Sequence, residues 1–184
     1  MSFPPNASAR APTPPADAHP LRSLLCVLAI IAVVWQLPYG RWMLYPLSLL
    51  ATCAHELGHG FTAMLVGAEF RSFALHADGS GLALWQGSAG RLATALVAAG
   101  GLLGPTLAGS LLLILARSSR LSRTLLWLLA GGLLAVVVCW TRNPFGVIFL
   151  VGAATFFAAV ALWLGDRGAT FVLRLTGAVP KHTA

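Results

Sequence analysis

The sequence predicts an all-α, multi-pass membrane protein with about five transmembrane helices and a short β-hairpin after the second. Three observations support this class: 58% of the 184 residues are apolar, only 9% are charged, and five apolar segments follow one another. Soluble globular domains carry about 25% charged residues, and the mean hydropathy of this chain is +0.81. A soluble enzyme, a disordered protein and an ordinary nucleic-acid-binding protein are therefore excluded.

The net charge of +7 does not indicate a nucleic-acid partner. The basic residues occur singly or in short loops between apolar segments, where Lys and Arg set the orientation of a membrane protein. All but one of them are arginine, which is typical of a GC-rich bacterial genome. We expect a multi-pass integral protein of the bacterial cytoplasmic membrane that contacts lipid and binds no nucleic acid.

The chain divides into a short tail and one transmembrane domain. Residues 1–20 are rich in proline and cannot bury a core, so we expect a disordered tail followed by a single domain over residues 21–184. Each span must be helical, because lipid offers no partner for main-chain polar groups. The first segment is short against the roughly 20 residues that a bilayer requires, but it can extend to residues 21–39. The five expected spans are residues 24–37, 42–66, 92–116, 124–140 and 144–164.

Two further segments carry local signals. Between the second and third spans, residues 73–75 and 82–84 alternate around a turn at 78–81. This pattern predicts a hairpin, and a surface loop is the alternative. Residues 169–179 are modestly apolar, so we expect either a short amphipathic helix on the membrane surface or a frayed end.

The second span contains the stretch that carries chemistry, His55-Glu56-Leu57-Gly58-His59. Histidines at i and i+4 lie on one face of a helix and can bind one metal ion. Zinc suits imidazole nitrogens and lowers the pKa of a coordinated water to about 7. Glu56 lies beside the metal and can take a proton from that water. A chance match on a core helix is the alternative, but Glu56 is the only acid in the five spans, and intramembrane acids are costly.

This stretch in an apolar helix, followed by a hairpin and a Gly104-Pro105 helix, resembles the site-2 protease family of intramembrane zinc metalloproteases (peptidase family M50). The similarity is greatest to its small M50B-like branch and covers residues 42–165. The resemblance implies a zinc metalloendopeptidase that cleaves a transmembrane protein substrate, with His55 and His59 as zinc ligands and Glu56 as general base. It also implies that the hairpin holds the unwound substrate by strand addition.

The sequence departs from the family pattern at the third zinc ligand. The broader family takes this ligand from the Asp of N-x-x-P-x-x-P-L-D-G. Aligning Asn143 with the Asn of that motif places Val151 at the Asp position. Asn143 is therefore a candidate third ligand or oxyanion donor, and its alternative role is the N-cap of a helix that starts at Pro144. Asp166, Asp78 and His76 have ordinary structural explanations.

Three functions follow from these residues. The first is an intramembrane zinc metallopeptidase. The second is a non-catalytic pseudoprotease or metal-binding subunit that retains the fold, which the missing Asp favours. The third is a small transporter or assembly factor in which the two histidines and Glu56 relay protons. Against this third function, the chain has no internal repeat of the kind that transporters show.

Overall fold

The computed structural model describes residues 20–37, 39–87, 90–116, 119–163 and 166–178. Except for Pro20, the predicted tail lies outside the described residues. The described part contains six helices and one two-stranded antiparallel sheet. The elements are α1 (Pro20–Gln36), α2 (Gly40–Leu65), β1 (Glu69–Leu75), β2 (Gly81–Gln86), α3 (Arg91–Leu115), α4 (Ser119–Cys139), α5 (Pro144–Trp163) and α6 (Asp166–Ala178).

Three of the described helices are long and apolar enough to cross a membrane: Arg91–Leu115, Leu121–Cys139 and Pro144–Trp163. The helix α2 has 26 residues and is about 39 Å long, which exceeds a hydrocarbon core of about 30 Å. It is less apolar than α3 and α5 because it carries the His-Glu-His stretch. The helix α1 contains only a shorter apolar stretch, Leu25–Val34. The predicted multi-pass helical class is confirmed, and the expected number of spans is approximate.

The outward face of α3 is apolar. On α3 a row of large apolar side chains is exposed, which in water would be an unusually large apolar patch. The chain is a membrane protein, and this row lies on one of its candidate membrane spans. Its members are Leu92, Leu96, Leu102, Leu103, Leu107, Leu111 and Ile114.

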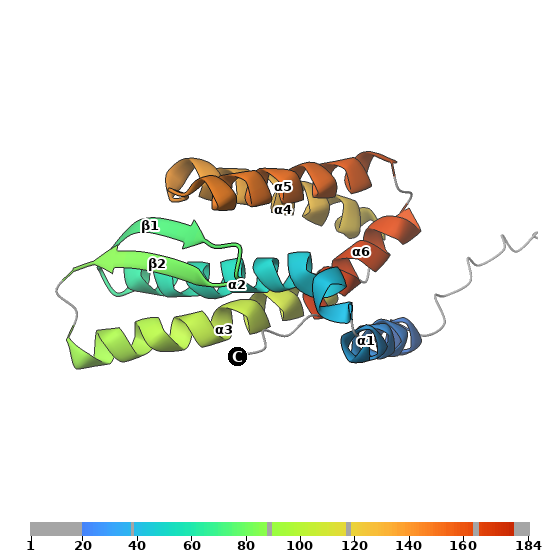
Figure 1. The fold of residues 1–184 in the computed structure, drawn as a ribbon, viewed down its shortest axis with the longest axis horizontal. Helices are drawn as coiled ribbons and strands as arrows, with labels where there is room; N and C mark the ends of the chain where they lie inside the picture. Colours follow the sequence, from blue (N-terminus) through green and yellow to red (C-terminus); the bar gives the residue numbers. More distant parts are fainter. Residues whose placement is uncertain (1–19, 38, 88–89, 117–118, 164–165, 179–184) are drawn as a thin grey trace, which may run out of the picture.

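The helices form two antiparallel pairs with the hairpin between them (Figure 1). One pair is α4 and α5, and the other is α2 and α3. The hairpin packs on α2, and α6 crosses from one pair to the other, contacting α3 and α4. Ala169 and Leu173 of α6 are almost completely buried. One face of α6 thus packs against the rest of the protein, and Asp166–Ala178 is helical, as one of the two sequence-based alternatives expects, rather than frayed. Its position relative to the membrane surface stays a prediction.

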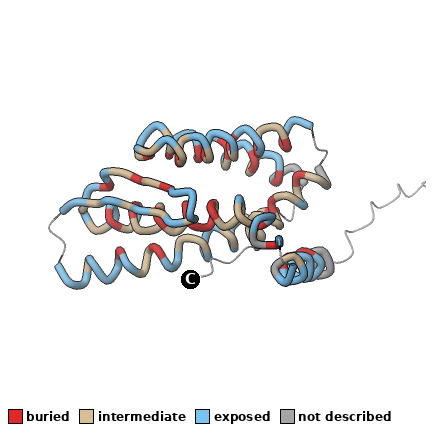
Figure 2. The backbone as a smooth tube through the Cα atoms, viewed as in Figure 1, coloured by how far each residue is buried: buried red, intermediate tan, exposed pale blue. Residues whose placement is uncertain are grey.

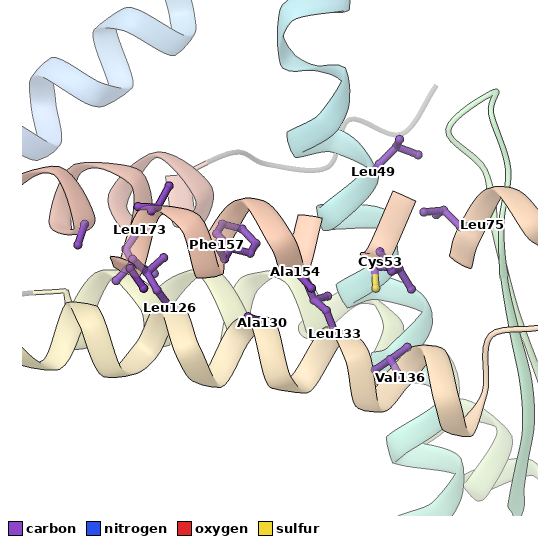
Figure 3. Close-up of a cluster of buried hydrophobic side chains, with 14 of the residues drawn as sticks. Leu49, Cys53, Leu75, Leu126, Ala130, Leu133, Val136, Ala154, Phe157 and Leu173 are labelled. Carbon is purple, nitrogen blue, oxygen red and sulfur yellow. The ribbon is translucent and has the colours of Figure 1, made fainter. Parts of the chain in front are cut away.

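The buried residues, red in Figure 2, lie mainly on the sides of these elements that face one another. The main core joins five of them (Figure 3). Leu49 and Cys53 of α2 meet Leu75 of β1, and the core continues to Phe157 of α5 and Leu173 of α6. Leu126, Ala130, Leu133 and Val136 of α4 complete it. This core ties the hairpin and α2 to the α4–α5 pair.

The helices α2 and α3 approach closely because glycine lines their crossing. A Cβ atom at Gly58 would lie 2.3 Å from the carbonyl oxygen of Gly100, and one at Gly104 would lie 2.3 Å from that of Ala54. Gly100 and Gly104 form a small-x-x-x-small pair, which lets helix main chains come together in a membrane. This crossing brings the His-Glu-His stretch of α2 directly against α3.

The predicted hairpin is confirmed. Phe73 pairs with Ala83 and Leu75 pairs with Gly81, and the register shifts once between Phe70 and Ser72. Gly79 at the turn has φ = +90°, a conformation that favours glycine. Two side chains of α2 hold the turn: the Tyr45 hydroxyl donates to Ala77 O, and Thr52 Oγ1 donates to Gly79 O at 3.0 Å. The hairpin is therefore anchored to the helix that carries the histidines.

Candidate metal site

The two histidines lie one turn apart on α2, as their spacing predicts. Their Nε2 atoms are 3.1 Å apart, and the rings meet edge to face with a centroid separation of 4.7 Å. Both residues are partly buried. A hydrogen bond from one Nε2 to the other accounts for this distance in the absence of a metal. Exchange of that proton for a metal ion shared by both nitrogens requires little movement of the rings.

The helix α3 sets the tautomer of His59, that is, which of its two ring nitrogens carries the proton. Its Nδ1 lies 2.8 Å from the carbonyl oxygen of Val97. A carbonyl can only accept, so Nδ1 carries the proton and Nε2 keeps its lone pair for the side that faces His55. Metal-binding histidines are commonly oriented by such a bond from the second ring nitrogen. Gly101 provides the space, since a Cβ there would lie 2.1 Å from His59 Nε2.

The histidine pair fits zinc as two of its ligands. Zn–N distances are about 2.0–2.1 Å, so nitrogens 3.1 Å apart subtend roughly 100° at the metal, near the tetrahedral value. Catalytic zinc sites have three protein ligands. Among the described residues no group of three His, Cys, Asp or Glu side chains could hold a metal ion. Among the described residues, the two histidines therefore remain an incomplete candidate set for zinc.

Glu56 is 8% exposed, and its carboxylate reaches the hairpin. Its Oε2 accepts a hydrogen bond from the main-chain N–H of Ala83 at 3.0 Å. The Glu56 stem packs against Gly81, where a Cβ would lie 2.6 Å from Glu56 Cγ. A buried carboxylate needs such a partner, because burial without one is costly. Sequence reasoning missed the contacts of Ala83 and Gly81 with Glu56, although it placed Ala83 in the second half of the hairpin and Gly81 in its turn.

The outer edge of β1 is occupied by hydrogen bonds to residues 140–143. In an antiparallel ladder, alternate pairs direct their main-chain groups away from the partner strand, and Phe73 and Leu75 do so here. Phe73 N–H donates to Trp140 O at 2.9 Å, and Arg142 N–H donates to Phe73 O at 3.1 Å. Leu75 N–H donates to Asn143 Oδ1 at 3.1 Å, and Asn143 Nδ2 donates to Leu75 O. The segment that enters α5 thus bonds to the outer edge of β1, where Phe73 and Thr141 form an isolated parallel β-bridge.

Asn143 precedes Pro144, the first residue of α5, as the N-cap interpretation expects. Its side-chain amide, however, binds Leu75. The role of Asn143 as a third ligand or oxyanion donor stays a prediction, and the contacts observed are structural.

The remaining candidates lie elsewhere in the fold. Val151, at the position where the family has its Asp, is on α5 and 39% exposed. Asp78 lies in the hairpin turn, where its Oδ1 accepts from Ser80 Oγ at 2.6 Å and from Ser80 N–H at 2.9 Å. His76 is exposed beside Ser80. The side chain of Asp166 lies outside the described residues. The structure thus brings together His55, Glu56 and His59.

The fold and the site define a class: a helical membrane protein in which a histidine pair and a buried glutamate on one helix adjoin a β-hairpin. The sequence model of the Peptidase M50B-like family matches residues 24–180, which takes in nearly all of the described elements. The chain belongs to this family, a branch of the M50 site-2 proteases. No curated protein and no solved structure gives a significant match.

Proposed function

We propose that this protein is an intramembrane zinc metallopeptidase that hydrolyses a peptide bond of a membrane-protein substrate. The carrying observation is the 3.1 Å approach of the two Nε2 atoms, with His59 fixed by its Nδ1 bond to Val97 O. Membership of the M50B-like family supports the same activity. The proposal assigns His55 and His59 as ligands and Glu56 as the general base.

Each of these residues has one task. Zinc held by the histidines would supply a Lewis acid that acidifies a coordinated water and polarises the scissile carbonyl. Glu56 takes a proton as the water oxygen bonds to the carbonyl carbon, and gives it to the nitrogen as the C–N bond breaks. The burial of Glu56 against Gly81 limits the positions that its carboxylate can reach.

The hairpin holds the substrate in the proposed mechanism. A transmembrane helix hides its peptide bonds in its own hydrogen-bond ladder, so it must be unwound before it is cut. The outer edge of β1 is occupied by residues 140–143, and in the described part of the chain no strand pairs with the outer edge of β2. We assign β2 as the edge to which an unwound substrate segment adds.

The test begins with the zinc content per chain of detergent-purified protein, measured for the parent and for His59→Ala. We expect near-stoichiometric zinc in the parent and its loss in the variant. Glu56→Gln should then keep zinc and lose cleavage of a labelled transmembrane reporter peptide. Glu69→Gln is the matched control, because Glu69 is an exposed acid on β1 that pairs with Arg71. Loss of zinc in Glu56→Gln would contradict the role assigned to Glu56.

One observation favours a second function, a non-catalytic pseudoprotease or metal-binding subunit. The described residues supply only two zinc ligands of the His, Cys, Asp and Glu types, and Val151 stands where the family has its Asp. Absence of zinc from both the parent and His59→Ala after repletion with zinc would favour the non-catalytic pseudoprotease over the zinc metallopeptidase.

We place this activity in the bacterial cytoplasmic membrane. The partners we propose are lipid and a transmembrane protein substrate, and nucleic acid is not one of them. Three helices able to span a membrane and the exposed apolar row on α3 support the lipid partner.

A further inference from the structure

The outer edge of β2 lies beside Glu56. Leu82 and Leu84 pair inward with Ala74 and Ser72 of β1, so Ala83, between them, directs its main-chain groups away from β1. On the opposite strand, the outward groups of Phe73 are used by residues 140–142. On β2 the outward N–H of Ala83 is used by the carboxylate of Glu56.

This contact has the geometry of a strand-to-strand bond. The distance from Ala83 N to Glu56 Oε2 is 3.0 Å, within the ordinary range for a main-chain N–H and a carbonyl oxygen. A segment that added to β2 would place one of its own carbonyl oxygens on this same N–H. The N–H has a single proton to donate, so the substrate carbonyl and the Glu56 carboxylate compete for it.

We infer that Glu56 closes the edge of β2 in the substrate-free protein, and that an incoming substrate strand displaces its carboxylate from Ala83. This inference rests on the proposed function, because it couples substrate binding to the release of the general base. Ala83 is then a positioning residue, which holds Glu56 before binding and the substrate main chain afterwards. Because Ala83 holds the carboxylate until the substrate strand is in place, Glu56 becomes available as a general base only when a peptide bond is bound.

The surroundings of Glu56 favour a displacement of the carboxylate over a movement of the whole residue. Gly81 packs closely against the stem of Glu56 and against Thr52: a Cβ at Gly81 would lie 2.6 Å from Glu56 Cγ and 2.8 Å from Thr52 Cγ2. Thr52 in turn holds the hairpin turn through Gly79 O. Stem and hairpin are therefore fixed to each other, and rotation about the last side-chain bonds is the movement that remains for the carboxylate.

The first test measures amide hydrogen exchange, residue by residue, by NMR on the full chain in metal-free detergent micelles. We expect the Ala83 amide to exchange at least about tenfold faster in Glu56→Ala than in the parent, because it loses a charged acceptor. Glu56→Gln should be intermediate, since a neutral oxygen accepts more weakly. The Leu84 amide, which pairs inside the hairpin, should be unchanged and so reports that the hairpin is folded. Equal exchange of Ala83 in all three proteins overturns the inference.

The second test measures the affinity for a fluorescent peptide of about 20 apolar residues with a central Gly-Pro break. We expect Glu56→Ala to bind it roughly three- to tenfold more tightly than the parent, because the competitor for Ala83 N–H is gone. Glu69→Ala also removes one negative charge, but from a residue that lies away from this edge. This variant should bind the peptide with the affinity of the parent.

Ala83→Pro removes the N–H while leaving the inward pairs of β2 intact, since proline is tolerated where the N–H points outward. In this background the gain from Glu56→Ala should vanish. A gain that persists there, or equal affinity of Glu56→Ala and the parent, contradicts the inference. Both tests use metal-free protein. A chain without protease activity would therefore refute the proposed function alone, whereas an unchanged Ala83 amide would refute the displacement alone.

Discussion

The side-chain amide of Asn143, at the start of α5, hydrogen-bonds to both main-chain polar groups of Leu75, the last residue of β1. The two residues are 68 positions apart in the sequence. The amide takes the place of one residue of a neighbouring strand, offering an acceptor to the N–H and a donor to the carbonyl. It thereby fixes the end of β1, and Leu75 in turn pairs with Gly81, which packs against Glu56.

Asn143→Ala should destabilise the protein without removing zinc. The change leaves two partly buried groups of Leu75 without their partners, which costs about 1–3 kcal/mol for each unsatisfied group. We expect a lower thermal midpoint in detergent and an unchanged zinc content. Asn143→Asp should lower the midpoint too, because a carboxylate cannot donate to Leu75 O. A folded Asn143→Ala protein that has lost its zinc would support Asn143 as a ligand.

Gly101→Ala should weaken zinc binding about 10–100-fold. The added Cβ would lie 2.1 Å from His59 Nε2, so the ring must leave its place beside Val97 O. Loss of a ligand's orientation typically weakens metal affinity by about 10–100-fold. The measurement is a zinc titration of the purified variant against a chelator. Gly131→Ala on α4 is the control, because nothing lies within 4 Å of a Cβ there. Parent-like affinity in Gly101→Ala would show that the His59 orientation is not required.

Gly81→Ala should reduce catalysis and leave zinc binding intact. Its Cβ would meet Glu56 Cγ at 2.6 Å, and the three atoms nearest to it belong to Glu56 and Thr52 rather than to the histidines. A displacement of a reacting group by about 1 Å can cost about 10²-fold in rate. Turnover of the transmembrane reporter peptide and the zinc content, measured on the same preparation, test this. Gly152→Ala, which meets nothing within 4 Å, should behave as the parent. Unchanged turnover in Gly81→Ala would argue against Glu56 as the base.

The stabilising contact between Asp78 and Ser80 in the hairpin turn should be lost at acid pH. Ser80 lowers the pKa of Asp78, first through its side-chain hydroxyl and then through its main-chain N–H. The folded protein therefore favours the charged carboxylate, and the contribution of this contact is present above the ordinary Asp pKa of about 3.9. It is lost as the pH falls through the lowered value. Ser80→Ala should raise the pKa of Asp78 back toward the ordinary value, as read from a carboxyl NMR titration. An identical titration curve in parent and variant would contradict this.

Local patterns predicted much of the fold. Long apolar segments predict membrane-spanning helices, because a helix satisfies the hydrogen bonds of its own main chain where lipid offers no partner. Alternation around residues 78–81 predicted the hairpin that the structure contains. The packing of α6 was not predictable, because its buried face depends on which helices lie beside it. For the same reason the pattern around Asn143 and Pro144 suggested a helix cap but not a bond to Leu75.

The sequence by itself determined that the chain is a helical membrane protein, that a hairpin follows its second helix, and that two histidines and Glu56 share one helix. Spacing along one element is a local property, so it can be read from residue types. Only the tertiary structure decided the proton position of His59, the partner of Glu56 and the partner of Asn143. The partners concerned, Val97, Ala83 and Leu75, act through main-chain atoms. Every residue has these atoms, so no side-chain pattern reveals which of them a fold will bring to a site.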